Sequence, residues 1–434
     1  MRKFEQELSL LVAEHGAEDL SPLRFRRLIG GMQSMLQGVG RDALTKMLES
    51  LDVPVASVEV DGIKLRFRGT AEREWLSPFG KIRIRRRTYR SDGPDACAST
   101  PLDERCGMLG RYMTPDVEEM AAIGAAMLTA NEVELLLSKV LPQGPSATAV
   151  QHAVEKLGTA IESKREAIET AIEQEKPLSV DGDVLVASWD GVMMSMREPD
   201  GTAWREAGVA TVSVYRSGKA GPEKIDTRYL ARMPESGMCS LVEAVATQVA
   251  TAHSHTTRRA TVVICDGKNT IWDAATKHPS LRQAIQILDF YHASENLMKA
   301  ATAIFGDTKE ASRWHSRHRA AMQLDKNGAH NARRSMLRYA KALPQGSEER
   351  DIVENAAKYF GKHRDRMRYA DFIARGLPIG SGPVESAAKN IVQARLRRSG
   401  MRWSRDGGQH VLDLRAYLKS DRWEAMWNTL HQAA

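Results

Sequence analysis

The chain has few cysteines and no long apolar run, and both shortages exclude classes of protein. Four of its 434 residues are cysteine, and none forms a Cys-x-x-C pair. We therefore expect neither a disulfide framework nor a structural zinc site. The longest apolar stretch, residues 121–130, is too short to cross a bilayer. Acids near the start leave no apolar segment for a signal peptide, so we expect a cytoplasmic protein without a membrane partner.

Common catalytic motifs are also missing. The chain has no His-Glu-x-x-His zinc motif. The segment Gly380-Ser381-Gly382-Pro383 lacks the Gly-Lys-Ser/Thr of a phosphate-binding loop, and it does not match the Gly-x-Ser-x-Gly of serine hydrolases. It predicts a tight turn entering a helix, with Ser381 near the N-cap and Pro383 in the first helical turn.

The charge balance is basic. Lysine and arginine outnumber aspartate and glutamate by 62 to 55, a net charge of +7, and the sequence pI is about 9.2. Spread evenly, this surplus only aids solubility, but clustered charge favours nucleic acid as a partner. Clusters occur at residues 81–90 and 395–405, and a solvated surface is the alternative for each. The candidate DNA-binding arginines are Arg83, Arg85, Arg86, Arg87, Arg395, Arg397, Arg398 and Arg402.

Three carboxylates stand in settings that suit a metal site. Asp190 follows the apolar run 184–189, Asp266 follows the apolar run 260–265, and Glu385 follows the turn at 380–383. An apolar run ending in Asp-Gly predicts a buried strand and then a turn. If the two strands are neighbours, both Asp residues lie at one sheet edge, and a helical Glu completes an all-oxygen site for Mg²⁺ or Mn²⁺. For either Asp alone a plain turn is an equal alternative, and the helix dipole equally allows a structural Glu385.

Hydrophobic periodicity predicts two smaller regions ahead of this part. Residues 55–90 alternate as a small antiparallel sheet with a hairpin turn at Asp61-Gly62. Residues 133–157 predict a helix, a turn and a second helix capped by Ser146. This spacing fits a helix-turn-helix in which Gln151 contacts base edges, and it fits an ordinary helical hairpin equally well.

From residue 183 onwards the pattern is rich in strands. Three consecutive strands precede alternating helices and strands, and the stretch from 293 to 374 is helical only. The predicted strands are 184–189, 207–215, 224–231, 260–265 and 284–290, and the predicted helices are 240–253 and 270–277.

The order strand-Asp, strand-Asp and distant helical Glu is the pattern of ribonuclease-H-like DDE transposases. More closely, the chain resembles bacterial insertion-sequence transposases of the Kra type, which are relatives of the Mutator superfamily. The matching segments are Ser188-Trp189-Asp190-Gly191, Ile264-Cys265-Asp266-Gly267, Asp289-Phe290-Tyr291-His292 and residues 377–386, with upstream segments at 79–89 and 101–103. The resemblance spans residues 75–405, approximately three quarters of the chain.

The resemblance implies an α/β fold. We expect a ribonuclease-H-like mixed five-stranded sheet with an all-helical insertion, preceded by a helical and small-β DNA-binding half. The expected parts are a helical segment 1–54, a small basic β domain 55–110, a helix-turn-helix-like region 111–178, the catalytic domain 179–292 with 376–405, the helical insertion 293–375 and a C-terminal helix 406–434.

The resemblance also implies a function. We expect an insertion-sequence transposase that binds terminal inverted repeats and cleaves and transfers DNA strands. Asp190, Asp266 and Glu385 would hold two Mg²⁺ or Mn²⁺ ions, and because carboxylates repel one another, at least one should have a raised pKa. Asp289 and His292 would support the site, although Asp289 could instead cap the following helix.

The expected partners are double-stranded DNA, as terminal repeats and as target, and further copies of the chain in a homodimer or larger assembly. The expected location is the cytoplasm, in association with the nucleoid. The alternative function is a catalytically inactive, transposase-derived DNA-binding protein, and the intact Asp190, Asp266 and Glu385 argue against it.

Overall fold

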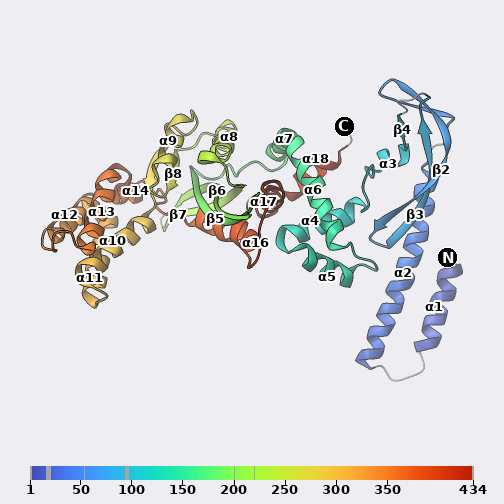
Figure 1. Ribbon diagram of the computed structural model, residues 1–434, viewed down its shortest axis with the longest axis horizontal. Helices are drawn as coiled ribbons and strands as arrows, with labels where there is room; N and C mark the ends of the chain where they lie inside the picture. The colour runs from blue at the N-terminus through green and yellow to red at the C-terminus, as the bar shows by residue number, and fades with distance from the viewer. Residues whose placement is uncertain are drawn as a thin grey trace. The chain divides into compact units, whose positions relative to one another are not determined.

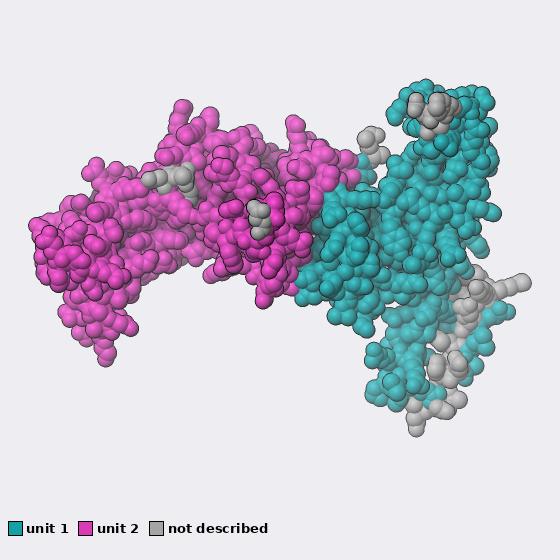
Figure 2. Space-filling model, viewed as in Figure 1, with its two compact units in different colours: residues 1–157, 431–434 teal, residues 158–430 magenta. Residues whose placement is uncertain are grey.

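The computed structural model describes residues 2–15, 21–52, 54–92, 97–199, 201–218 and 220–432. The chain forms two compact units, one of residues 1–157 with 431–434 and the other of residues 158–430 (Figures 1 and 2). The first unit contains a four-stranded sheet and the second a five-stranded sheet.

The first unit starts with two helices, α1 (Arg2–His15) and α2 (Pro22–Ser50). An antiparallel sheet follows in the order β1-β2-β3-β4. Its strands are β1 (Ser57–Val60), β2 (Ile63–Ser77), β3 (Gly80–Arg90) and β4 (Ala98–Ser99). The predicted hairpin turn is confirmed, because Asp61 and Gly62 both adopt positive φ between β1 and β2.

Alternation along β3 builds the core of this sheet. Ile82 and Ile84 are buried with Trp75 of β2 and Leu48 of α2, whereas Lys81, Arg83 and Arg85 on the other face are exposed. Successive side chains of a strand point to opposite faces. Because Ile82 and Ile84 face the core, Lys81, Arg83 and Arg85 face the solvent.

Four helices complete the unit and lead out of it: α3 (Pro101–Arg105), α4 (Pro115–Met127), α5 (Ala130–Val140) and α6 (Ala147–Ser163). The predicted helix, turn and helix are present as α5 and α6. Ser146 caps α6, as predicted, because its Oγ accepts a hydrogen bond of 3.2 Å from the N–H of Ala149. A Cβ on Gly144 would lie 2.8 Å from the backbone nitrogen of Ser138, so the turn requires glycine there.

The second unit is built on a mixed sheet in the order β7-β6-β5-β8-β9. Its strands are β5 (Val184–Glu198), β6 (Gly201–Gly218), β7 (Gly221–Arg232), β8 (Ala260–Cys265) and β9 (Ile285–Leu288). The first three pair antiparallel, while β8 pairs parallel with both β5 and β9. The predicted mixed five-stranded sheet of an α/β protein is confirmed.

Several predicted strand ends were wrong. The strand predicted at 207–215 runs from Gly201 to Gly218, and the one predicted at 224–231 runs from Gly221 to Arg232. Two further errors lie beside the candidate site. The run at 184–189 does not stop at Asp190-Gly191, because β5 continues to Glu198 and Asp190 pairs with Val209 of β6. Gly191 does not form a turn. It lets the side chain of Glu206 lie close to the backbone of β5, since a Cβ at Gly191 would lie 2.0 Å from Oε1 of Glu206. The last strand ends at Leu288, not at 290, because the next residue already caps a helix.

Helices cover the sheet. The helix α8 (Cys239–His255) packs on β5, β6 and β7, and the segment with α15 (Gly382–Ala387), a π-helical turn (Ala388–Gln393) and α16 (Ala394–Leu396) also packs on β5 and β6. In Figure 1, α8 and α16 lie on opposite sides of the sheet. The short helix α9 (Asn269–Lys277) connects β8 to β9.

A helical block stands between β9 and α15. Its helices are α10 (Phe290–Phe305), α11 (Lys309–Leu324), α12 (Gly328–Ala340), α13 (Glu348–Lys362) and α14 (Tyr369–Ala374). Buried Met322, Met336 and Val353 belong to the same hydrophobic cluster as the sheet. Trp314 is partly buried against this cluster, and its Nε1 donates to Ser335 Oγ at 3.2 Å.

The chain ends in two helices where the sequence predicted one. These are α17 (Arg405–Lys419) and α18 (Trp423–His431), separated where Asp421 adopts a φ of 53°. Within the described ranges, none of the helices combines the length and the apolar character needed to cross a membrane.

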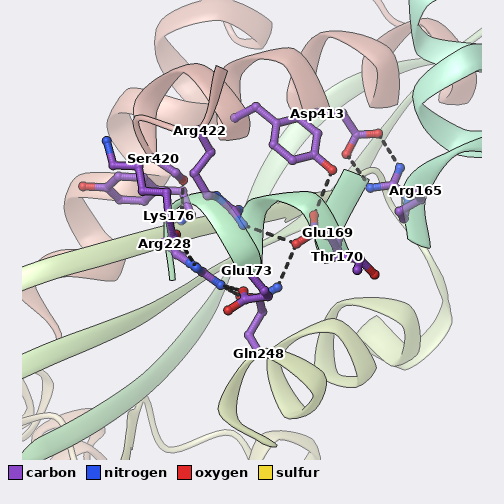
Figure 3. A network of polar contacts seen from close by, with 12 residues as sticks. Arg165, Glu169, Thr170, Glu173, Lys176, Arg228, Gln248, Asp413, Ser420 and Arg422 are labelled. Carbon is purple, nitrogen blue, oxygen red and sulfur yellow. Dashed lines mark hydrogen bonds and ion pairs between the residues drawn. The ribbon is translucent and has the colours of Figure 1, made fainter. Parts of the chain in front are cut away.

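A polar network fixes α7 (Arg165–Glu175) within the second unit (Figure 3). Glu169 accepts hydrogen bonds from Tyr417 and Gln248, at 2.8 and 2.9 Å, and it forms an ion pair with Arg422. Arg228 of β7 pairs with Glu173 and donates to Oε1 of Gln248 at 2.6 Å. These bonds join α7, β7, α8 and the C-terminal helices, and they give the buried cations Arg228 and Arg422 acidic partners.

Candidate active site

Strand register places two of the predicted acids side by side. In the parallel pair of β5 and β8, Ala187 is level with Val263, and Asp190 and Asp266 each lie three residues farther along. In the next pair, Cys265 is level with Leu288, so Asp289 follows β9 at the level of Asp266. Three carboxylates from the neighbouring strands β5, β8 and β9 therefore lie at one level of the sheet, next to the carboxyl ends of β8 and β9.

The environment of Asp190 disfavours the ionised form of its carboxyl group. Burial is the largest cause that raises its pKa above the ordinary value, and the neighbouring charge of Asp266 raises it further. The N–H of Gly191, which donates to Oδ1 at 2.7 Å, opposes this rise, as do the cations Lys268 and His292. A cation that entered here would therefore stabilise a carboxylate that now lacks a strong counter-charge.

Asp266 organises the turn after β8. Its Oδ1 accepts a hydrogen bond of 3.0 Å from the N–H of Lys268, and the ammonium of the same lysine lies 4.0 Å from Oδ2. That ammonium also pairs with Oε1 of Glu206 at 2.7 Å. Lys268 and Glu206 were not among the predicted site residues. The position of Lys268, two residues after Asp266, could have indicated that it belongs to the site. No feature of the sequence indicates this for Glu206.

Asp289 is fully buried, and its hydrogen bonds make it a positioning residue. Its Oδ1 accepts from the N–H of His292 at 2.8 Å and lies 3.3 Å from Nδ1 of the same residue, while Oδ2 accepts from the N–H of Ser381. Burial alone would raise the pKa of Asp289, but these hydrogen bonds outweigh it and hold the pKa below its ordinary value. Asp289 therefore caps α10, the alternative we considered, and also holds the turn before Glu385.

Glu385 and His292 form the other half of the site. Glu385 lies in the first turn of α15, and one ligand atom from each of Asp289, His292 and Glu385 lies within 4.8 Å of the other two. The hydrogen bond to Asp289 is the main cause that raises the pKa of His292 to about 9. His292 is thus a cation at neutral pH, and its charge also interacts with the carboxylates of Asp266 and Asp190.

The structure therefore gathers the predicted triad in two parts. Asp190 and Asp266 stand together, Glu385 stands with His292 and Asp289, and the charge of His292 acts on both parts. Among the described residues, no three-membered cluster contains all of Asp190, Asp266 and Glu385. The carboxylate oxygens on each side fit Mg²⁺ or Mn²⁺, which prefer such hard ligands.

The turn before Glu385 runs along the end of β9. The N–H of Phe290 donates to the carbonyl of Ile379 at 3.0 Å. A Cβ on Gly380 would lie 2.8 Å from the ring of Tyr291, so the close approach requires glycine. Tyr291 remains 53% exposed beside the site, and exposed aromatic rings can stack on unpaired bases.

A cavity of about 510 Å³ adjoins the acids in the second unit. Its lining includes Trp189, which precedes Asp190, and Lys268, together with Arg205, Glu206 and Arg405. Trp189 is only 1% exposed, so the accessible part of the lining is mainly charged, and its cations suit an anionic ligand.

One arginine of the first basic cluster points inward. Arg86 is 8% exposed, and its Nε pairs with Oδ1 of buried Asp103 at 2.6 Å. Strand alternation explains this, because Arg85 faces outward and its neighbour must then face the core. Of the predicted set on β3, Arg83 and Arg85 are exposed, and Arg87 is half-buried over the ring of Phe67. Arg86 does not belong to the outer face.

The second basic cluster divides in the same way. Arg395 is 5% exposed, and its guanidinium lies 4.9 Å from the ring centre of Trp403. Arg397 and Arg402 are exposed, and Arg398 is half-buried with its Nε donating to the carbonyl of Ala394 at 3.2 Å. Trp403 is held in place, since its Nε1 donates to the carbonyl of Leu396 at 3.0 Å.

In the first unit, Thr148 and Gln151 are exposed on the first turns of α6. Both side chains are therefore accessible at the helix end that a helix-turn-helix presents to the major groove. An ordinary helical hairpin would leave them accessible as well.

No family model matches the chain, and no curated protein matches it. Among solved structures, it is similar to one described as the Drosophila P element transposase strand transfer complex, at 12% identity over 71% of this chain and 79% of that chain, with a TM-score of 0.25. A crystal structure of NurA bound to dAMP and manganese shows 12% identity over 65% of this chain and 63% of that chain, with a TM-score of 0.10. Neither TM-score is high enough to support a fold or a function.

Proposed function

We propose that the protein is a DDE transposase, an enzyme that cuts DNA at terminal inverted repeats and joins the ends to target DNA. The observation that carries this proposal is the alignment of Asp190 and Asp266 on adjacent parallel strands, with Glu385 joined to the same sheet edge through Asp289. The strand order β7-β6-β5-β8-β9 is compatible with a ribonuclease-H-like fold.

The reaction breaks one phosphodiester bond and forms another. An attacking hydroxyl loses its proton, a 3′-oxygen leaves with negative charge, and the phosphate repels the nucleophile. Two divalent ions, about 4 Å apart in such enzymes, supply the positive charge that counters all three effects. Asp190 and Asp266 would both bind the first ion. Glu385 would bind the second ion, and Asp190 would also contact it.

The neighbouring residues have distinct tasks in this proposal. Asp289 keeps the turn at Ser381 in place, and so fixes the position of Glu385 relative to the sheet. His292, held by Asp289, presents a cation to the scissile phosphate. Lys268 balances the charge of Asp266 and Glu206 until the ions and DNA bind.

DNA recognition would use surfaces outside this centre. Exposed Arg83 and Arg85 on β3 would contact backbone phosphates, as would Arg397 and Arg402 beyond Glu385, and Gln151 on α6 would read base edges. Because two DNA ends must be held at once, the active form would be a homodimer or a larger assembly.

Cleavage of a labelled duplex tests this function directly. The duplex should carry the inverted repeats that bracket the reading frame, and it should be incubated with the full chain in Mg²⁺, in Mn²⁺ and in excess chelator. We expect site-specific 3′-OH ends with either metal and none with the chelator. Specific binding without cleavage would favour an inactive, transposase-derived DNA-binding protein.

A further inference from the structure

The helical block between β9 and α15 carries the net charge of the whole chain. Residues 293–375 contain 17 lysines and arginines against 10 aspartates and glutamates, a surplus equal to the +7 of all 434 residues. The remainder of the chain is neutral on balance. Since net charge acts on partners rather than on the fold, this block as a whole should attract anions.

Within this block lies a pocket lined by cations. It has a volume of about 450 Å³ and lies where the start of α12 meets the end of α13 and the turn that follows. Phe360 and Met367, both buried, contribute apolar walls, and none of the described residues that line it is an acid. The basic residues that line it are Lys326, His330, Arg333, Lys358, Arg364 and Arg368.

Acids near the pocket do little to neutralise it. Lys326 lies 3.8 Å from Asp371, and Arg364 lies 3.7 Å from Asp365, but these cations are 81% and 80% exposed. Ion pairs at such exposed positions are worth only about 0–1 kcal/mol. The pocket therefore keeps several like charges around one hollow, and an anion inside it would relieve their repulsion.

One of these cations is held in a fixed orientation. The Nε of Arg333 donates to the carbonyl of Ala357 at 3.2 Å, and a Cβ on Gly361 would lie 2.9 Å from that Nε. Gly361 therefore leaves room for the guanidinium, whose remaining N–H groups can form the paired hydrogen bonds that Arg makes with phosphate oxygens. This is a feature of a binding site rather than of a merely solvated surface.

We propose that this pocket binds a phosphate group of the DNA backbone, independently of base sequence. This inference rests on the proposed function for its choice of ligand, since a free nucleotide or inorganic phosphate has the same chemistry. DNA is favoured because the surplus charge extends over the whole block, whereas a single small anion needs only the pocket.

Salt-dependent binding tests the proposal without requiring cleavage. The variant Lys358→Gln with Arg364→Gln removes two exposed cations of the pocket. The control Lys309→Gln with Lys341→Gln removes the same charge from the same block. At 1.5 Å per helical residue, Lys341 is about 12 Å from Arg333, the nearest pocket residue along α12, and Lys309 is about 22 Å from Leu324 at the other end of α11. Binding of the full chain to a duplex without terminal repeats should be measured across a salt series.

We expect the log–log salt slope of the pocket variant to fall by about 0.9, the value for one lost phosphate contact. The control should keep the slope of the unaltered protein. An unchanged slope in the pocket variant, or equal losses in both variants, would overturn the proposal. Thermal unfolding checks that both variants fold.

A second arm separates DNA from small phosphates. Inorganic phosphate and a mononucleotide are titrated into the unaltered protein and into the pocket variant. Weak binding of both, with DNA binding weakened in the variant, supports the backbone site. Tight mononucleotide binding that is lost in the variant, with DNA binding unaffected, would overturn it. A protein that binds duplex through this pocket yet never cleaves would contradict the proposed function and leave this inference standing.

Discussion

Asp289 and Ser381 are joined by a hydrogen bond from the N–H of Ser381 to Oδ2 of Asp289, although 92 residues separate them in the chain. The helical block lies within that interval, so the bond joins the chain segment that enters the block to the segment that leaves it. Because Asp289 also caps α10 and contacts His292, one buried carboxylate sets both the start of the block and the turn before Glu385.

Asp289→Asn should destabilise the protein and reduce cleavage. An asparagine amide would place a donor against either the N–H of His292 or that of Ser381, and a buried group left without a partner costs about 1–3 kcal/mol. Urea unfolding measures the loss. Asp365→Asn is the matched control, because Asp365 is 86% exposed, and it should change stability little. Equal stability of the two variants would show that the buried bonds contribute nothing.

Stability should depend on pH through His292. Its pKa is raised from 6.5 to about 9 in the folded state, so the folded protein binds this proton more tightly than the unfolded chain does. The resulting stabilisation is complete below about pH 6.5 and is lost as the pH rises through 9. Urea unfolding of the unaltered protein and of His292→Gln, at pH 6 and pH 10, gives the comparison. The difference between them should shrink at pH 10, and a difference that stays constant would contradict the pairing with Asp289.

Arg397→Ala with Arg402→Ala should weaken DNA binding at low salt and flatten its salt dependence. Both side chains are exposed and follow the segment that holds Glu385. If both contact phosphates, the log–log slope should fall by about 1.8. Fluorescence anisotropy across a salt series measures it, with the Lys309 and Lys341 double variant as the control for charge. A slope equal to that of the control would place these arginines away from DNA.

Gln151→Ala should lower the preference for the terminal repeat over scrambled DNA. A bidentate contact from glutamine to adenine is worth about 1–3 kcal/mol of discrimination. Competition binding with both duplexes measures the ratio, and Arg83→Ala serves as a contrast that should weaken binding to both alike. An unchanged ratio for Gln151→Ala would make α5 and α6 a structural hairpin.

Much of the sheet could be predicted from local patterns, because buried strands carry apolar runs. The run at 260–265 matches β8 at both ends. The same rule failed at Asp190-Gly191, where Asp-Gly suggested a turn. The glycine there instead makes room for Glu206 on the neighbouring strand, a contact that no local pattern contains.

The site was less predictable than the sheet, because long-range contacts build it. Counting along β3 assigns Arg86 to the inner face once Ile82 and Ile84 face inward, so that error was avoidable. The bond between Asp289 and Ser381 was not predictable, since nothing near either residue marks the other. The burial of Arg395 depends likewise on the return of the chain at Trp403.

The central claim is that Asp190, Asp266 and Glu385 are the metal-binding acids of a DNA-cleaving enzyme. The most direct measurement is cleavage of a terminal-repeat duplex in Mg²⁺ by Asp190→Asn, Asp266→Asn and Glu385→Gln, beside gel-shift binding of the same duplex and the control Asp365→Asn. We expect each of the three variants to lose cleavage while keeping DNA binding, and the control to keep both. Near-normal cleavage by any one of the three would remove that residue from the metal site and contradict the account.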